Sequence, residues 1–111
     1  MIQKYRFGAP VPTCAVTEDI PVSGGEMPFF TVRDDGQLTY RLSENDIVYG
    51  LGEQVRGINK RGWRYESCCA DDCNHQEDTR SLYGAHNFFI VSGKELFGAF
   101  IDYAGVIAFD V

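Results

Sequence analysis

The chain of 111 residues has few basic side chains. Lys and Arg together number 10, against 16 Asp and Glu, which gives a formal net charge of −6 at pH 7. A protein that binds nucleic acid needs a basic surface to displace counterions from phosphates. The basic residues between Arg56 and Arg64 are diluted by the nearby Glu53 and Glu66. This balance predicts no nucleic acid partner and favours a solvated charged face.

Long apolar runs are also missing. One of the longest, at residues 88–91, is far too short to cross a bilayer. Residues 1–6 lack the apolar stretch of a signal peptide. We therefore expect no membrane partner and a cytoplasmic location.

Cysteine is scarce, and its spacing is not that of a disulfide framework. Cys68 and Cys69 are adjacent and Cys14 is isolated, so reduced thiols are expected in a chain without a secretory signal. Cys73 and His75 add donors that zinc accepts, but the Cys-x2-Cys pair of a structural zinc site is absent. The sequence predicts no metal and no cofactor, and it leaves a zinc-stabilised loop open as an alternative.

Amphipathic helical periodicity is absent as well, whereas aromatic residues make up 14% of the chain. Gly (12) and Pro (4) separate short runs of aromatic and β-branched residues. This composition is typical of β-structure, and the length allows one domain at most, with a modest core. We predict an all-β, antiparallel domain.

The chain divides at residue 27 into two expected parts. Residues 1–27 hold three of the four prolines and form an extended segment, with at most an edge strand at residues 3–7. Residues 28–111 form the β-domain, which begins with a hairpin around Asp35-Gly36. A one-turn helix capped by Ser43 is a further option. The expected strands cover residues 29–33, 38–42, 47–49, 61–66, 86–91, 96–102 and 106–111.

Gly50-Leu51-Gly52 follows the strand at residues 47–49 and invites comparison with a phosphate-binding loop. That fingerprint needs a further glycine at position 55, which is Val55, and a helix to follow it. Because both are missing, the sequence predicts a turn at the end of a strand.

A polar run at residues 68–80 interrupts the β-pattern and carries two acidic pairs, Asp71-Asp72 and Glu77-Asp78. Carboxylates act as general acids and bases or accept hydrogen bonds from sugar hydroxyls. Adjacent carboxylates usually point apart, so neither pair is a ready catalytic dyad. From the residue types alone, solvated loop charge is the favoured interpretation of these residues.

Aromatic residues flank this polar run. Sugar rings stack on aromatic faces, but packing in a β-core uses the same side chains. The residue types leave both roles open for Trp63, Tyr65, Tyr83 and Phe88.

An ordered set of motifs covers residues 47–111. It contains Tyr-Gly-Leu-Gly-Glu at residues 49–53, Cys-Cys-Ala-Asp at 68–71 in place of Trp-Asn-x-Asp, and strand motifs at 82–89 and 97–100. This set resembles the N-terminal segment of glycoside hydrolase family 31, the α-glucosidase family.

The resemblance implies a galactose-mutarotase-like antiparallel β-sandwich with a loop that reaches over the mouth of a (β/α)8 barrel. It also implies a parent enzyme that hydrolyses terminal α-linked glucose of oligosaccharides with retention of configuration. The catalytic aspartates of the family lie on the barrel, which this chain lacks. We therefore expect a partial segment that has no catalytic residue and is inactive alone. The expected substrate-binding residues are Asp71, Asp72, Trp63 and His75.

Two partners follow from this interpretation: an α-glucoside oligosaccharide and the catalytic barrel of the parent chain. A sheet cut from a larger sandwich exposes its edges, so a homo-oligomer is also expected. The alternative function is a stand-alone carbohydrate-binding module that uses Trp63, Tyr65 and the polar run.

Overall fold

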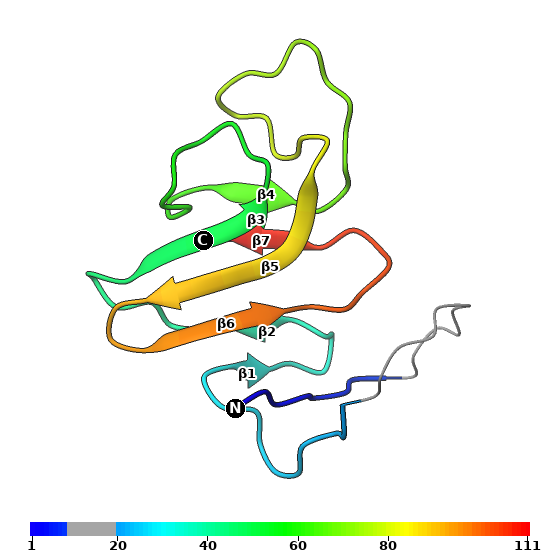
Figure 1. Ribbon diagram of the computed structural model, residues 1–111, viewed down its shortest axis with the longest axis vertical. Coiled ribbons are helices and arrows are strands. Elements are labelled where there is room, and N and C mark those ends of the chain that lie inside the picture. Colours follow the sequence, from blue (N-terminus) through cyan, green and yellow to red (C-terminus); the bar gives the residue numbers. More distant parts are fainter. Residues whose placement is uncertain (9–19) are drawn as a thin grey trace. The chain divides into compact units, whose positions relative to one another are not determined.

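The structure, a computed structural model, describes residues 1–8 and 20–111 (Figure 1). These residues contain β-strands and no helix, and every strand pair is antiparallel. The chain divides into two compact units, Met1–Arg41 and Leu42–Val111. The strands are β1 (Thr31–Val32), β2 (Leu38–Thr39), β3 (Ile47–Gly52), β4 (Arg64–Glu66), β5 (Ala85–Ser92), β6 (Leu96–Phe100) and β7 (Ala108–Asp110).

The unit Met1–Arg41 contains the predicted hairpin, formed by β1 and β2. Its turn uses the positive φ of Gly36 (+85°), and the Asp35 carboxylate accepts a hydrogen bond from the Gln37 amide at 3.0 Å. Asp-Gly thus supplies the turn chemistry that the sequence predicts. Each strand has two residues rather than the five expected.

The extended part of this unit differs from the prediction. Instead of an edge strand at residues 3–7, a single parallel bridge joins Lys4 to Val22. The Ser23 amide donates to the Lys4 carbonyl at 2.7 Å. The reduced thiol predicted for Cys14 lies outside the described residues.

The unit Leu42–Val111 holds a three-stranded sheet, in the order β3-β5-β6, and a two-stranded sheet, β4-β7. Val48 and Val91 are opposite each other in the register, and both are buried, with 3% and 2% exposed. The Phe89 ring meets the Phe109 ring of β7 edge to face, with centroids 6.0 Å apart. The core therefore lies between these two sheets, and the all-β antiparallel sandwich is confirmed.

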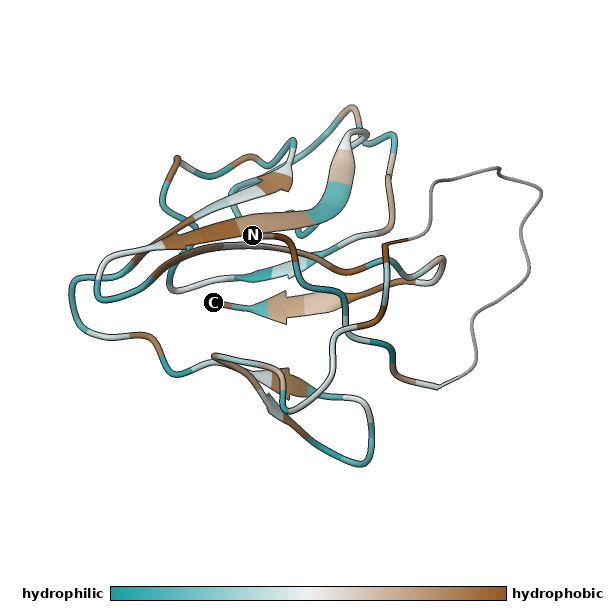
Figure 2. Cartoon of the chain, turned by 60° about the horizontal axis from the view of Figure 1, so that its bottom comes forward, coloured by the Kyte–Doolittle hydropathy of each residue, from teal (hydrophilic) through white to brown (hydrophobic). Residues whose placement is uncertain are grey.

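Hydropathy follows this arrangement. In Figure 2 hydrophobic residues dominate most of β5, after a hydrophilic stretch near its start, and hydrophilic residues are frequent in the loops. The opposite face of the larger sheet also carries apolar side chains: Phe88 is 40%, Leu96 is 76% and Phe100 is 66% exposed. That face is therefore apolar and accessible.

Residues 43–46 do not form the one-turn helix that Ser43 was expected to cap. The carboxylate of the buried Asp46 instead accepts hydrogen bonds from the backbone amides of Ser43 and Lys94, each at 2.8 Å. These bonds, chiefly that from Lys94, and the nearby Arg61 lower the pKa of Asp46. Residues 43–46 therefore form a single turn, in which the Asp46 amide donates to the Ser43 carbonyl at 3.2 Å, and the Asp46 carboxylate joins this turn to Lys94, 48 positions away.

Several expected strands are shorter in the structure. The strand expected at 61–66 begins only at Arg64, because Gly62 has a positive φ of +85° in the preceding turn. The strand expected at 96–102 ends at Phe100, and the last strand covers Ala108–Asp110 rather than 106–111. Within the described part of the chain, no helix has the length and apolar character that a membrane span requires.

Candidate functional site

The glycine-rich last part of β3 brings two backbones unusually close. Gly50, Leu51 and Gly52 have successive positive φ angles of +108°, +63° and +75°, and the register with β5 shifts between the two glycines. A Cβ atom on Gly50 would lie 2.9 Å from the Cα atom of Phe89. The motif therefore forms a bulge within β3, against β5, and the predicted turn at the end of a strand over 47–49 is wrong, because β3 continues through Gly52.

Glu53 follows this bulge and bonds to Gly84 in both directions. The Gly84 amide donates to Glu53 Oε2 at 3.1 Å, and the Glu53 amide donates to the Gly84 carbonyl, also at 3.1 Å. The sequence analysis included Glu53 only as the last residue of the Tyr-Gly-Leu-Gly-Glu motif and assigned it no role. Its position directly after two glycines was the available signal for a structural role.

Two further backbone contacts join the ends of the polar run. The Glu66 amide donates to the Arg80 carbonyl at 2.8 Å, and the Ala70 amide donates to the Leu82 carbonyl at 3.2 Å. The Arg80 guanidinium also pairs with the Glu66 carboxylate at 3.2 Å. We call these contacts and the Glu53–Gly84 pair the loop neck, and residues 68–80 the acidic loop.

The acidic loop is exposed beyond the loop neck. Asp72 Oδ1 accepts a hydrogen bond from the Asn74 amide at 2.9 Å, and His75 Nδ1 lies 3.3 Å from the Asp72 carbonyl oxygen. Asp71 is exposed beside them. The structure therefore brings three of the predicted substrate-binding residues together on one exposed loop, and Asp72 and His75 make a direct contact.

The three described cysteines are free and exposed, as expected of reduced thiols. The Cys69 thiol donates to the Ala85 carbonyl at 3.3 Å. Among residues 1–8 and 20–111, no three His, Cys, Asp or Glu side chains are grouped as metal ligands would be. The described residues offer no support for the alternative of a zinc-stabilised loop.

Trp63 lies apart from the acidic loop in its contacts. The Arg56 guanidinium carbon is 3.8 Å from the centre of its ring, and 40% of Trp63 is exposed. Trp63 lines a shallow hollow of about 440 Å³ with Gly62, Arg64, Asp110 and Val111, and no residue of the acidic loop contributes. Trp63 therefore offers a separate aromatic surface.

Tyr65 is wholly buried, with 0% of the residue exposed. Desolvation raises the pKa of its hydroxyl, although the nearby Arg56 opposes the shift. The interpretation of Tyr65 as a sugar contact is therefore wrong, because a ring in the core cannot stack on a ligand.

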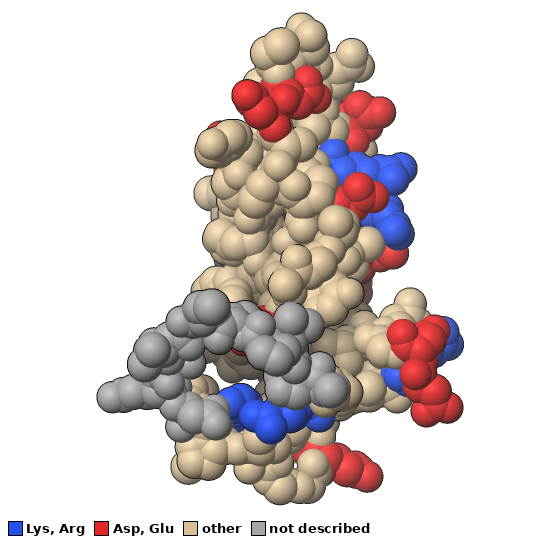
Figure 3. Space-filling model, turned by 90° about the vertical axis from the view of Figure 1, so that its right-hand side faces the viewer, with Lys and Arg blue, Asp and Glu red and all other residues tan. Residues whose placement is uncertain are grey.

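In the unit Leu42–Val111, some basic side chains form ion pairs and others are buried. Figure 3 shows basic side chains interspersed with acidic ones on the face in view. Arg64 pairs with Asp110 at 2.8 Å. Lys60 is 6% exposed and donates to the carbonyls of Arg56 and Gly57, and desolvation, with a smaller effect of Arg56, lowers its pKa. The basic residues between Arg56 and Arg64 therefore do not form a continuous cationic surface.

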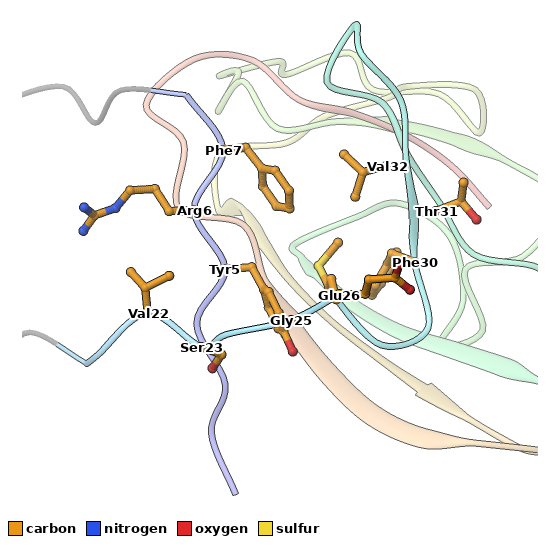
Figure 4. Close-up of a pocket in the computed structure, with 11 residues that line it drawn as sticks. Tyr5, Arg6, Phe7, Val22, Ser23, Gly25, Glu26, Phe30, Thr31 and Val32 are labelled. Carbon is orange, nitrogen blue, oxygen red and sulfur yellow. The ribbon is translucent and has the colours of Figure 1, made fainter.

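A second hollow, of about 540 Å³, lies within the unit Met1–Arg41. Tyr5, Phe7 and Val32 line it, whereas the Arg6 guanidinium points away from Phe7 and Val32 (Figure 4). None of the four predicted substrate-binding residues lines it. Its lining is mixed, because Arg6, Ser23, Glu26 and Thr31 lie beside the aromatic and aliphatic residues.

Comparison with known protein families gives a match over most of the chain. No curated protein matches the chain. Residues 23–110 match the Glycosyl hydrolase 31 N-terminal galactose mutarotase-like domain, and this range contains all the strands, the loop neck and the acidic loop. One family model therefore covers most of the chain, and its fold is the one that the sequence predicts. The chain belongs to the family of the glycosyl hydrolase 31 N-terminal galactose mutarotase-like domain.

Proposed function

We propose that the chain is the N-terminal β-sandwich segment of a cytoplasmic, retaining α-glucosidase-like enzyme. In this proposal the acidic loop contributes contacts to terminal α-linked glucose of an oligosaccharide in the substrate pocket. Family membership implies a glycoside hydrolase parent. The α-glucosidase specificity, the location and the role of the loop are the parts proposed here.

The observation that carries the proposal is the contrast between the fixed base of the acidic loop and its exposed polar end. Backbone hydrogen bonds join residues on both sides of the loop, whereas Asp71, Asp72 and His75 are exposed. Exposed loops on a rigid scaffold commonly carry binding residues. Carboxylate oxygens accept hydrogen bonds from sugar hydroxyls, and the His75 ring supplies a further polar group.

This set of groups suits binding rather than bond cleavage. Glycoside hydrolysis with retention needs two carboxyl groups on opposite sides of the scissile bond, about 5–5.5 Å apart. Asp71 and Asp72 are neighbours on one loop, and Asp72 already accepts the Asn74 amide. The catalytic carboxylates are therefore assigned to the barrel of the parent, and we expect no turnover of an aryl α-glucoside by the chain alone.

The test is maltose binding by Asp71→Ala and Asp72→Ala, with Asp102→Ala as the matched control. Asp102 is exposed and follows β6, outside the acidic loop. Loss of a carboxylate acceptor predicts affinity about three- to tenfold weaker for the two loop variants and unchanged for the control. Equal affinity in all three variants and the unmodified chain would contradict the proposal.

A further inference from the structure

Glu53 occupies a position from which it can control the acidic loop without belonging to it. It lies 31 positions before Gly84, and it bonds to Gly84 through both its side chain and its backbone. Gly84 is the last residue of the loop neck before β5 begins at Ala85. A contact here fixes where the chain leaves the loop and enters the sheet.

The bulge before Glu53 makes this contact possible. The φ of Gly52 is +75°, and a Cβ atom there would overlap the Gly84 carbonyl oxygen and lie 3.0 Å from the His86 amide nitrogen. Without a side chain at Gly52, the two backbones approach closely enough for the Glu53 carboxylate to reach the Gly84 amide. Gly52 and Glu53 therefore act on Gly84 together.

The opposite side of the loop neck has a different construction. There the Glu66 and Ala70 amides donate to the carbonyls of Arg80 and Leu82. The salt bridge of the exposed Arg80 with the half-buried Glu66 adds little. The Glu53–Gly84 bond is exposed as well, but it is the one backbone hydrogen bond of the loop neck that a carboxylate accepts, and charge-assisted bonds are stronger than neutral ones.

We infer that Glu53 is a positioning residue of the acidic loop: its carboxylate, bound to the Gly84 amide, holds the loop in the shape that presents Asp71 and Asp72 to a sugar. This inference rests on the proposed function for the sugar contact, but the fastening of the loop is independent of it. Glu53 itself does not touch the ligand.

The experiment compares Glu53→Ala, Glu53→Gln and Glu95→Ala with the unmodified chain. Glu95 is exposed in the turn between β5 and β6 and serves as the matched control. Amide hydrogen exchange is measured for residues 70–84 and, as a reference, for Val91 in the core. The same samples are then titrated with maltose and followed by NMR chemical shifts.

Loss of the carboxylate predicts exchange about three- to tenfold faster at Gly84 and Ala70 in Glu53→Ala, with Val91 unchanged. Exchange in Glu53→Gln should lie between that of Glu53→Ala and that of the unmodified chain, because its amide oxygen still accepts the Gly84 hydrogen but without the charge. Maltose affinity should fall in Glu53→Ala, recover in part in Glu53→Gln and stay constant in Glu95→Ala. A role in overall stability alone would accelerate exchange at Val91 as well.

Two failures are distinguishable. Unchanged exchange in residues 70–84 of Glu53→Ala, or faster exchange that includes Val91, overturns the positioning role. Faster exchange confined to the loop, together with no maltose shifts in the unmodified chain, supports the fastening of the loop by Glu53 and overturns the proposed function instead.

Discussion

Replacing Gly52 with Ala perturbs the point at which β3, the bulge and the loop neck meet. The residue has a φ of +75°, which L-amino acids other than Gly adopt at a cost of roughly 1–2 kcal/mol. The added methyl group would also overlap the Gly84 carbonyl oxygen and approach the Ala85 Cα atom to 3.1 Å. Both opposing atoms belong to the backbone, so neither can turn away as a flexible side chain would.

The expected magnitude combines these two effects. Forcing an extra methyl group into a tightly packed place costs about 1–3 kcal/mol. Together with the backbone term, Gly52→Ala should lower the free energy of unfolding by about 2–5 kcal/mol. That is a large share of the stability of a domain of this size, which is about 5–15 kcal/mol.

The assay is urea unfolding followed by the fluorescence of the single tryptophan, Trp63. Gly57→Ala is the matched control, because a Cβ atom there meets no atom within 4 Å and no positive φ is involved. That control should match the unmodified chain or gain up to about 1 kcal/mol. Equal midpoints for Gly52→Ala and Gly57→Ala would refute the account of the bulge.

Two further predictions concern the core and the exposed sheet face. Asp46→Asn should lower the urea midpoint near neutral pH. The pKa of Asp46 is lowered from its ordinary value of 3.8. The contribution of the carboxylate to the free energy of unfolding is therefore present above pH 3.8 and lost as the pH falls below it. The difference between variant and unmodified chain should therefore shrink below pH 3.8, and a constant difference would contradict this. The exposed apolar face around Leu96 and Phe100 predicts self-association, which Leu96→Lys should weaken and Gln76→Lys, on the acidic loop, should not. Light scattering over a concentration series measures both, and a monomer at every concentration would contradict the prediction.

The sequence predicted elements whose signals are local. The hairpin of β1 and β2 follows from the turn residues Asp35-Gly36. Strand β5 follows from the apolar run at residues 88–91. For both, neighbouring residues determine the conformation. The turn predicted at residues 50–52 was wrong, because these residues stay in β3 and form a bulge against β5, which is distant in the sequence.

Long-range contacts explain the errors. The bonds of Asp46 to the amide of Lys94, and of Glu53 to the amide of Gly84, cross 48 and 31 positions and leave no local signal. Trp63 and Tyr65 are two positions apart, yet one is 40% exposed and the other buried, because β4 begins only between them. The alternation of a strand therefore did not apply to Trp63, and burial could not be predicted from spacing.

The central claim is that the acidic loop binds sugar, and residue-resolved NMR titration of the unmodified chain with maltose tests it most directly. The account predicts shifts at Asp71, Asp72 and His75, at millimolar affinity, with the amides of β5 and β6 unchanged. Shifts at Trp63 and its hollow, with none in the acidic loop, would contradict it and move the sugar contact to that aromatic surface.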